Sequence, residues 1–235
     1  MRNILLASTS TIYGGEYLDY ILEDIDVLFK NCQEILFIPF ARPSGISHEN
    51  YTQQANLAFQ KINKTLVGLH TFKNKQDAIK NAKGIFVGGG NTFLLTSQLY
   101  KYDLVVSLKD SINKGTAYLG TSAGSNICGL TIKTTNDMPI VYPKSFNALG
   151  IVPFNINPHF IAKKELETHM GESRETRIKE FHCFNTQPVI GLKEGSWLEI
   201  NNATIRLKGK PNAVIFKHNT TPYEVLPNTI LNDIK

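Results

Sequence analysis

The sequence predicts an α/β protein with an open, mostly parallel twisted sheet that has helices on both faces. Short apolar runs alternate along the chain with segments in which apolar residues recur at helical spacing, and this alternation is typical of a parallel sheet with helical connections. At 235 residues the chain is long enough to bury a large core, and α/β chains of this length often form one domain. We therefore expect a single domain over residues 1–235.

The predicted strands are short apolar runs of the kind that is buried on both faces of a sheet. In chain order they are residues 3–7, 35–39, 65–68, 84–87 and 117–120. Sites in open α/β sheets form at the carboxyl ends of the strands. The two segments that stand there are GGGNT (88–92) and GTSAG (120–124), and they are the first candidates for a site.

Helices are predicted where apolar residues recur at intervals of three and four. The first two connections have this spacing, at Leu18, Ile21, Leu22, Ile25, Leu28 and Phe29 and then at Tyr51, Ala55, Ala58, Phe59 and Ile62. After residue 130 the pattern becomes irregular and rich in proline. Beyond it we expect a helix over residues 173–184 and short strands toward the C-terminus.

Composition and charge exclude several classes of protein. Charged residues make up 19% and hydrophobic residues 42% of the chain, as in ordinary folded proteins rather than disordered ones. The net charge is +5, but the lysines and arginines are scattered, so no nucleic-acid partner is indicated. A mild positive potential can still attract an acidic substrate. No apolar run approaches the length of a membrane span, and no membrane partner is expected.

The cysteines and the N-terminal segment indicate a cytoplasmic protein. Cys32, Cys128 and Cys183 are odd in number and widely spaced, with no C-x-x-C pair, so neither a disulfide framework nor a zinc cluster is predicted. The apolar run at the N-terminus is too short for a signal peptide.

The segment GTSAG matches the pattern G-x-S-x-G, in which a sharp turn between a strand and a helix exposes a nucleophilic serine. A serine hydroxyl needs an adjacent base, and acyl transfer also needs two donors aimed at the developing oxyanion. The N–H of Ala123, directly after Ser122, is one expected donor, and the consecutive glycines 88–90 offer another. Alternatively, the glycines only form a turn and Ser122 only caps the next helix.

Of the six histidines, His159 is the candidate base. It lies in the segment INPHF, after an apolar stretch and after a proline that restricts the backbone. The others lie in polar or helical contexts and are expected at the surface; they are His48, His70, His169, His182 and His218. No H-x-x-x-H or mixed Cys/His spacing is present, so a metal site is not predicted.

From end to end, the sequence resembles the peptidase E family of α-aspartyl dipeptidases. Seven segments carry the resemblance in the order that the family has them: FIPFA (37–41), FVGGGNTF (86–93), GTSAGSN (120–126), TIKTTNDMPIV (131–141), INPHF (156–160), GESRETRIKE (171–180) and VIGLKEGSW (189–197). The resemblance implies a serine peptidase on a sheet similar to that of class I glutamine amidotransferases. Such enzymes remove an N-terminal aspartate from dipeptides and need no metal, so no cofactor is expected.

Carried over residue by residue, the resemblance makes Ser122 the nucleophile, His159 the base, and the N–H groups of Gly90 and Ala123 the oxyanion hole. Two carboxylates compete for the third position of the triad. Glu194 is the one expected beside the imidazole, whereas Asp137 is the alternative. Because triad partners meet in space, their spacing in the sequence cannot decide between them. If Asp137 is not part of the triad, it organises its loop by binding backbone N–H groups. If Glu194 is not part of the triad, it is an exposed charge in a turn.

Selectivity for aspartate requires a cation in the S1 pocket, and the planar fork of arginine suits a carboxylate. In the segment GESRETR, Arg174 is the first candidate and Arg177 the second, since residues three apart lie on one face of a helix. The alternative is that both arginines pair with neighbouring acids, which are Glu172, Glu175 and Glu180. Asn91 and Thr92, next to the oxyanion glycines, are expected to help orient the substrate.

The expected partners are small acidic peptides, and the expected state is a monomer or a weak homodimer. Two other functions stay open. One is a cyanophycinase-like or β-aspartyl peptidase with a similar serine turn, although the length of the chain and its NDMP and GESRETR segments favour the dipeptidase. The other is a non-catalytic binding module on the same fold.

Overall fold

The structure, a computed structural model, describes residues 2–162 and 171–234 and is built around a seven-stranded sheet in the order β3-β2-β4-β5-β1-β8-β9. The first five strands of this order are parallel; they are Thr65–Gly68, Glu34–Ile38, Gly84–Val87, Ala117–Thr121 and Asn3–Ala7. The last two, Ser196–Asn201 and Thr204–Gly209, extend the sheet in the antiparallel sense. The predicted α/β class with a mostly parallel sheet is confirmed.

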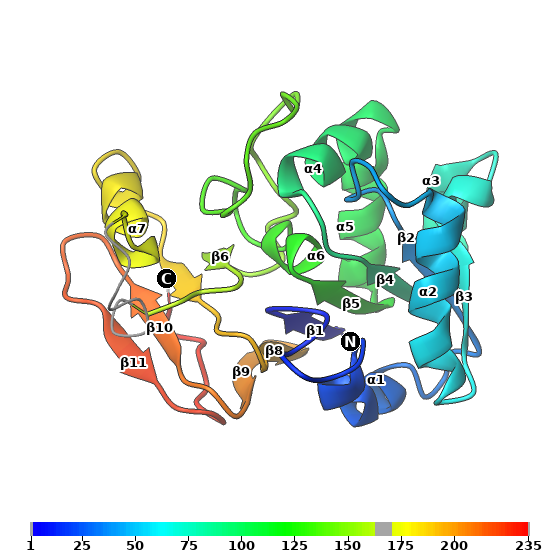
Figure 1. Cartoon of the computed structure of the whole chain (residues 1–235), viewed down its shortest axis with the longest axis horizontal. Coiled ribbons are helices and arrows are strands. Elements are labelled where there is room, and N and C mark those ends of the chain that lie inside the picture. The colour runs from blue at the N-terminus through cyan, green and yellow to red at the C-terminus, as the bar shows by residue number, and fades with distance from the viewer. Residues whose placement is uncertain (1, 163–170, 235) are drawn as a thin grey trace.

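Helices cover both faces of this sheet, because alternate side chains of each strand point to opposite sides. In β1, Ile4 and Leu6 belong to one buried cluster, whereas Leu5 and Ala7 belong to another. The first cluster includes side chains of α3, α4 and α5, and the second includes those of α1 and α2 (Figure 1). The bounds of these helices are Leu22–Leu28 (α1), His48–Gln60 (α2), Lys75–Asn81 (α3), Thr92–Lys101 (α4) and Leu104–Lys114 (α5).

Both of the helices predicted from apolar spacing in this part of the chain are present, although the first is interrupted. Leu18 adopts a left-handed backbone (φ 61°) and precedes a short 3-10 turn, Asp19–Ile21, before α1 begins. Ser47 caps the N-terminus of α2, because its side chain accepts a hydrogen bond from the N–H of Asn50. A second 3-10 turn, Leu69–Thr71, follows β3.

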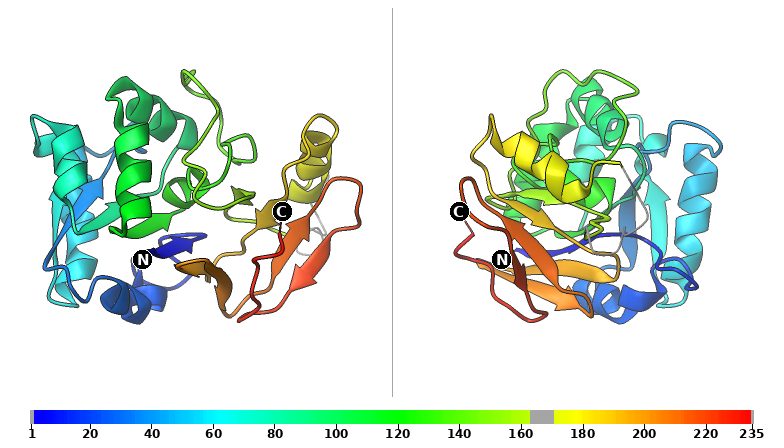
Figure 2. Two further views of the ribbon diagram at one scale, coloured as in Figure 1. Left: turned by 180° about the vertical axis from the view of Figure 1, so that it is seen from behind. Right: turned by 60° about the vertical axis from the view of Figure 1, so that its left-hand side comes forward.

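The C-terminal part of the chain forms a second, four-stranded sheet, which the sequence did not reveal. Its order is β11-β10-β7-β6; the bounds are Asn155–Asn157 (β6), Val189–Gly191 (β7), Ala213–Phe216 (β10) and Tyr223–Val225 (β11). These strands have only three or four residues each, which is too short for a clear alternation in the sequence. Figure 2 shows this sheet, coloured yellow to red, at the end of the molecule opposite β3.

The helix Arg174–His182 (α7) packs on this second sheet. It is close to the predicted 173–184, and the side chain of Ser173 caps it by accepting from the N–H of Thr176. Ile178 packs with Phe160 and with residues of the sheet in a third cluster. None of the described helices has the length and apolarity that crossing a bilayer requires.

Candidate active site

Ser122 occupies a sharp turn between β5, which ends at Thr121, and the short helix Ala123–Asn126 (α6). Its backbone has φ 52° and ψ −110°, a conformation that costs energy in a residue with a Cβ and that is a feature of functional sites. The N–H of Ser122 donates to the carbonyl of Ala7 at the end of β1 (3.1 Å). The hydroxyl does not cap α6, so the interpretation of Ser122 as a helix cap is wrong.

The two glycines of the GTSAG motif allow α6 to pack directly on the sheet. A Cβ on Gly120 would lie 2.5 Å from the carbonyl oxygen of Gly124, and a Cβ on Gly124 would collide with the carbonyl oxygen of Val87. The hydroxyl of Tyr118 also donates to the Gly124 carbonyl (2.7 Å). The backbone around Ser122 is therefore fixed by contacts that only glycine permits at these two positions.

The hydroxyl of Ser122 and the imidazole of His159 lie within hydrogen-bond distance. The Ser122 Oγ to His159 Nε2 distance is 2.9 Å, and on the other side of the ring the His159 Nδ1 to Glu194 Oε1 distance is 2.6 Å. His159 follows β6, and Glu194 lies in the turn between β7 and β8. Three segments that are distant in the sequence thus form one hydrogen-bonded chain of serine, histidine and carboxylate, the arrangement that activates a serine hydroxyl.

Ser8 holds the backbone of His159, and the sequence did not point to it. Its buried hydroxyl accepts from the N–H of His159 (2.9 Å) and donates to the carbonyl of Leu192 (2.8 Å). His159 itself has a positive φ of 53°, which costs energy unless such contacts offset it. The only sequence signal is the position of Ser8 directly after a buried strand, where sites form in this class of fold.

Asp137 lies at the start of α4 instead of beside the imidazole. Its carboxylate accepts from the N–H of Thr92 (2.7 Å) and from the hydroxyl of Thr135 (3.0 Å). These are the contacts of a residue that organises a loop and the N-terminus of a helix. The structure therefore brings together Ser122, His159 and Glu194 but not Asp137.

The side chains of Asn91 and Thr92 are engaged within the protein. Asn91 Oδ1 caps α4 by accepting from the N–H of Leu94 (3.0 Å), and Asn91 Nδ2 donates to the carbonyl of Met138 (2.8 Å). Thr92 is buried, and its hydroxyl oxygen lies 3.1 Å from that of Thr135. A contribution of these two residues to substrate orientation would therefore be indirect, through the shape of the loop.

The glycine segment 88–90 lies against Ser122. A Cβ on Gly89 would lie 3.1 Å from the Cβ of Ser122, and a Cβ on Gly90 would collide with the carbonyl oxygen of Ala41. Gly90 also has φ 142°, which favours glycine. The N–H groups of Gly90 and Ala123 have no acceptor within residues 2–162 and 171–234, so both can donate to a bound group.

Arg174 is a half-buried cation without an acidic partner in the described part of the chain. Burial lowers the pKa of its guanidinium, as does the nearby Arg177, while Asp137 opposes both effects. The predicted alternative, pairing with acids of the same helix, is not observed for Arg174. Glu175 pairs instead with Lys179 (2.8 Å). An unpaired, partly desolvated arginine is well suited to bind a carboxylate.

The remaining histidines do not gather around a metal. His182 is buried, contrary to the prediction, because its Nε2 lies 3.0 Å from the carbonyl of Gln187 and its ring packs against Phe181. His48 and His70 are partly buried, with ring centres 5.7 Å apart. His169 lies outside the described residues. In the part of the chain that the structure describes, no three His, Cys, Asp or Glu groups are arranged as metal ligands.

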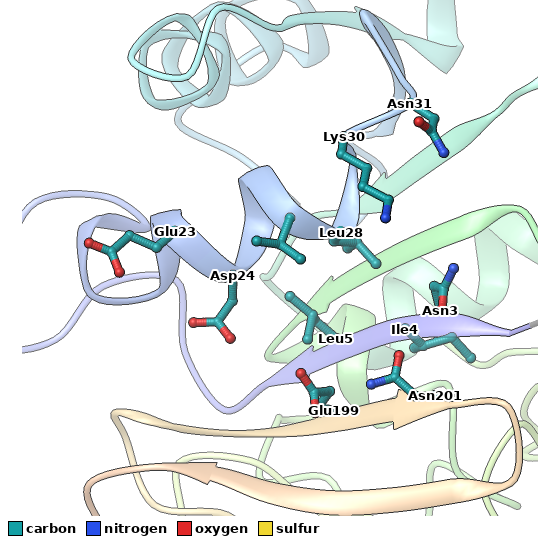
Figure 3. A pocket seen from close by; sticks show the side chains of 11 residues that line it. Asn3, Ile4, Leu5, Glu23, Asp24, Leu28, Lys30, Asn31, Glu199 and Asn201 are labelled. Carbon is teal, nitrogen blue, oxygen red and sulfur yellow. The ribbon is translucent and has the colours of Figure 1, made fainter.

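A hollow of about 400 Å³ lies at the opposite end of the strands, between α1 and the strands β1 and β8 (Figure 3). Asp24 and Glu199 flank it, and burial raises the pKa of Asp24. No serine, cysteine or histidine lines this hollow, so it lacks both the hydroxyl or thiol nucleophile and the imidazole base of a serine or cysteine hydrolase. The candidate site is therefore the Ser122 region.

Comparisons with known proteins find relatives that match nearly the whole chain. The model of peptidase family S51 matches residues 4–208. A Drosophila melanogaster protein named "Probable alpha-aspartyl dipeptidase" is 39% identical over 229 residues, which cover 96% of this chain and 94% of that protein. The peptidase E of Streptomyces coelicolor is 38% identical over 232 residues, covering 99% and 94%.

Among solved structures, a peptidase from an acI-B1 Actinobacterium has the same fold. The TM-score is 0.73 at 18% sequence identity, and the match covers 98% of this chain and 96% of that one.

We predict that Gly124→Ala destabilises the protein by about 1–3 kcal/mol, because the added Cβ forces α6 away from β4. Thermal or urea unfolding measures the change. Gly15→Ala is the control: its nearest atom would be the flexible Ile12 side chain, 3.1 Å away, so its stability should change little. Equal stability of the two variants would contradict the packing argument.

We further predict that Ser8→Ala lowers the free energy of unfolding by about 1–3 kcal/mol, since it leaves the N–H of His159 unpaired and removes one of the two hydrogen bonds that the Leu192 carbonyl accepts. Displacement of His159 should also slow the reaction of Ser122 with a fluorophosphonate by about tenfold or more. Labelling rates and unfolding curves are compared with those of Ser10→Ala, two residues further along. A labelling rate that stays native in Ser8→Ala would show that Ser8 does not position the imidazole.

Proposed function

Because the chain belongs to peptidase family S51, we propose that it is a serine dipeptidase that hydrolyses dipeptides with an N-terminal aspartate. The observation that carries the proposal is the hydrogen-bonded chain from Ser122 through His159 to Glu194. Its relatives at 38–39% identity include peptidase E and the protein named for α-aspartyl dipeptidase activity. We also propose that the seven-stranded sheet is similar to the sheet of class I glutamine amidotransferases.

In the proposed reaction, Ser122 Oγ attacks the scissile carbonyl carbon while its proton moves to His159 Nε2. The tetrahedral intermediate collapses, the C–N bond breaks, and the imidazolium gives that proton to the departing amine. A water molecule then attacks the acyl-enzyme by the same route and releases aspartate and free Ser122. Glu194 holds Nδ1–H in place and stabilises the imidazolium that forms in both halves of the reaction.

The N–H groups of Gly90 and Ala123 form the proposed oxyanion hole. Ala123 directly follows Ser122, and Gly90 follows Gly89, which lies against Ser122. Both N–H groups lack an internal acceptor among the described residues. Donors fixed in this way stabilise the charge of the transition state without having to reorganise during the reaction.

For the substrate, we assign Arg174 to the aspartate side chain. Its guanidinium is half-buried, no described acid pairs with it, and the Asp137 loop lies near it. A substrate carboxylate would then replace the missing partner and form charge-assisted hydrogen bonds. Arg177 is exposed and is the second candidate. No step of this mechanism requires a metal or an organic cofactor.

We predict that Ser122→Ala and His159→Ala each remove nearly all turnover of Asp-Leu, by several orders of magnitude. The double variant should be scarcely worse, because the two residues act as one unit. Steady-state kinetics with Asp-Leu measure the three losses. Additive losses would mean that the two residues act independently. Native turnover by Ser122→Ala would exclude Ser122 as the nucleophile, whereas a folded native protein without turnover would favour a binding module.

Between the carboxylates, Glu194→Gln should reduce kcat strongly and leave KM nearly unchanged, since it loses the charge that stabilises the imidazolium. Asp137→Asn should act mainly on stability, through the start of α4. The measurement is kcat, KM and thermal unfolding for both variants. The reverse ranking in kcat would move Asp137 into the triad.

We predict that Arg174→Met loses far more activity on Asp-Leu than Arg177→Met, because an aspartate side chain is costly to desolvate without a cation. Native protein should also reject Asn-Leu by several orders of magnitude, since the unpaired arginine is left unsatisfied. The kcat/KM values for Asp-Leu, Asn-Leu, Glu-Leu and β-Asp-Leu measure this selectivity.

Equal rates on Asp-Leu and Asn-Leu would exclude a cationic S1 pocket. A defect confined to Arg177→Met would shift the assignment by one helical turn. Preference for β-Asp-Leu would instead favour the β-aspartyl alternative.

A further inference from the structure

The hydroxyl of Tyr51 bonds the peptide that would supply one donor of the oxyanion hole. Tyr51 projects from α2 and is 3% exposed. Its hydroxyl donates to the carbonyl of Gly89 at 3.1 Å, and this hydrogen bond is buried. Gly88 leaves room for the contact, because a Cβ there would lie 2.5 Å from the Tyr51 hydroxyl.

The bond determines which way the Gly90 N–H points. The described peptide bonds are all trans, and in a trans peptide the C=O of one residue and the N–H of the next point in opposite directions. The Gly89 carbonyl points into the core toward Tyr51. The N–H of Gly90 must therefore point away from Tyr51, out of the core, and it meets no acceptor among the described residues.

Glycines on both sides of this peptide make its orientation easy to reverse. Neither Gly89 nor Gly90 has a Cβ that would oppose rotation of the plane between them. A backbone hydrogen bond holds the C-terminal end of the glycine segment, since the carbonyl of Ala41 accepts from the N–H of Asn91 (2.7 Å). The Tyr51 hydroxyl is the partner that holds the carbonyl itself.

We propose that Tyr51 is a positioning residue that keeps the Gly89–Gly90 peptide turned so that the Gly90 N–H faces the reacting carbonyl. The proposal rests on the function proposed above and adds a residue to that site. With the peptide reversed, the Gly89 oxygen would occupy the place of the donor and repel the oxyanion. The Tyr51 bond thus selects the active orientation of the hole.

The surroundings of Tyr51 fit this role. Its ring meets Phe37 edge-on, with ring centres 5.1 Å apart, and the guanidinium of Arg42 lies 5.0 Å from the ring centre. The hydroxyl of Tyr17 is also buried, and burial, together with the neighbouring Tyr51 hydroxyl, raises the pKa of Tyr17. These contacts hold Tyr51 rigidly.

The test is Tyr51→Phe, which removes one oxygen and keeps the ring. We expect kcat for Asp-Leu to fall by about 10- to 100-fold, as for a weakened oxyanion donor, with KM changed by less than about threefold. The boronic acid analogue of aspartate, whose adduct with Ser122 is tetrahedral, should bind more weakly by a similar factor. Inhibition by aspartate, which mimics the ground state, should stay native.

Two controls separate positioning from general damage. Tyr100→Phe deletes a hydroxyl that donates to the carbonyl of Asn147 at the same 3.1 Å, away from the site. This control should keep native kcat and native boronate affinity. Replacement of Tyr51 by 4-aminophenylalanine, which retains a donor at the ring tip, should restore much of the lost kcat.

The outcomes are distinct. Native kcat in Tyr51→Phe, an equal loss in Tyr100→Phe, or equal weakening of aspartate and boronate binding would overturn the role of Tyr51 while leaving the dipeptidase function intact. Failure of the native protein to hydrolyse any Asp-X dipeptide would overturn the proposed function, and the positioning role with it.

Discussion

The close packing of α6 on the sheet is the constraint on which the rest of the site depends. Only Ser122 separates the end of β5 from the start of the helix. The helix fits there because Gly120 and Gly124 carry no side chains. Ser122 between them must then adopt φ 52°, which turns its side chain out of the strand. The strain at one residue is offset by the well-packed backbone around it, and the hydroxyl acquires a fixed position at the carboxyl edge of the sheet.

The antiparallel strand β8 brings the carboxylate to the same edge. Because β8 runs against β1, its first residues lie beside the last residues of β1, with Trp197 opposite Ala7. The turn before β8 therefore projects beyond the carboxyl end of β1, and Glu194 lies in that turn. Ser8, directly after β1, connects the two segments: its hydroxyl accepts from the N–H of His159 and donates to the carbonyl of Leu192. His159 follows β6 of the second sheet, and Glu194 lies between β7 of that sheet and β8 of the first, so the imidazole and its carboxylate meet at the junction of the two sheets.

Charge at the site is distributed in the way that the proposed chemistry needs. The acids near Ser122 are already engaged, Glu194 with His159 and Asp137 with the start of α4. Arg174 has no such partner among the described residues, and burial disfavours its charged form. Binding of an acidic side chain would relieve this cost. Under the proposed assignment of Arg174 to the substrate, this half-buried cation gives a physical reason for preferring aspartate over its amide.

The sequence by itself determined the α/β class, the parallel strands and the serine turn. These are local properties: apolar runs and helical spacing report burial, and GTSAG carries the two glycines that its turn requires. Only the tertiary structure decided what depends on contacts across the chain. Glu194 rather than Asp137 lies beside His159, Ser8 and Tyr51 hold the backbone, and short strands build a second sheet. Residues separated by 35 to 151 positions form these hydrogen bonds, and spacing along the chain carries no information about such distances in space.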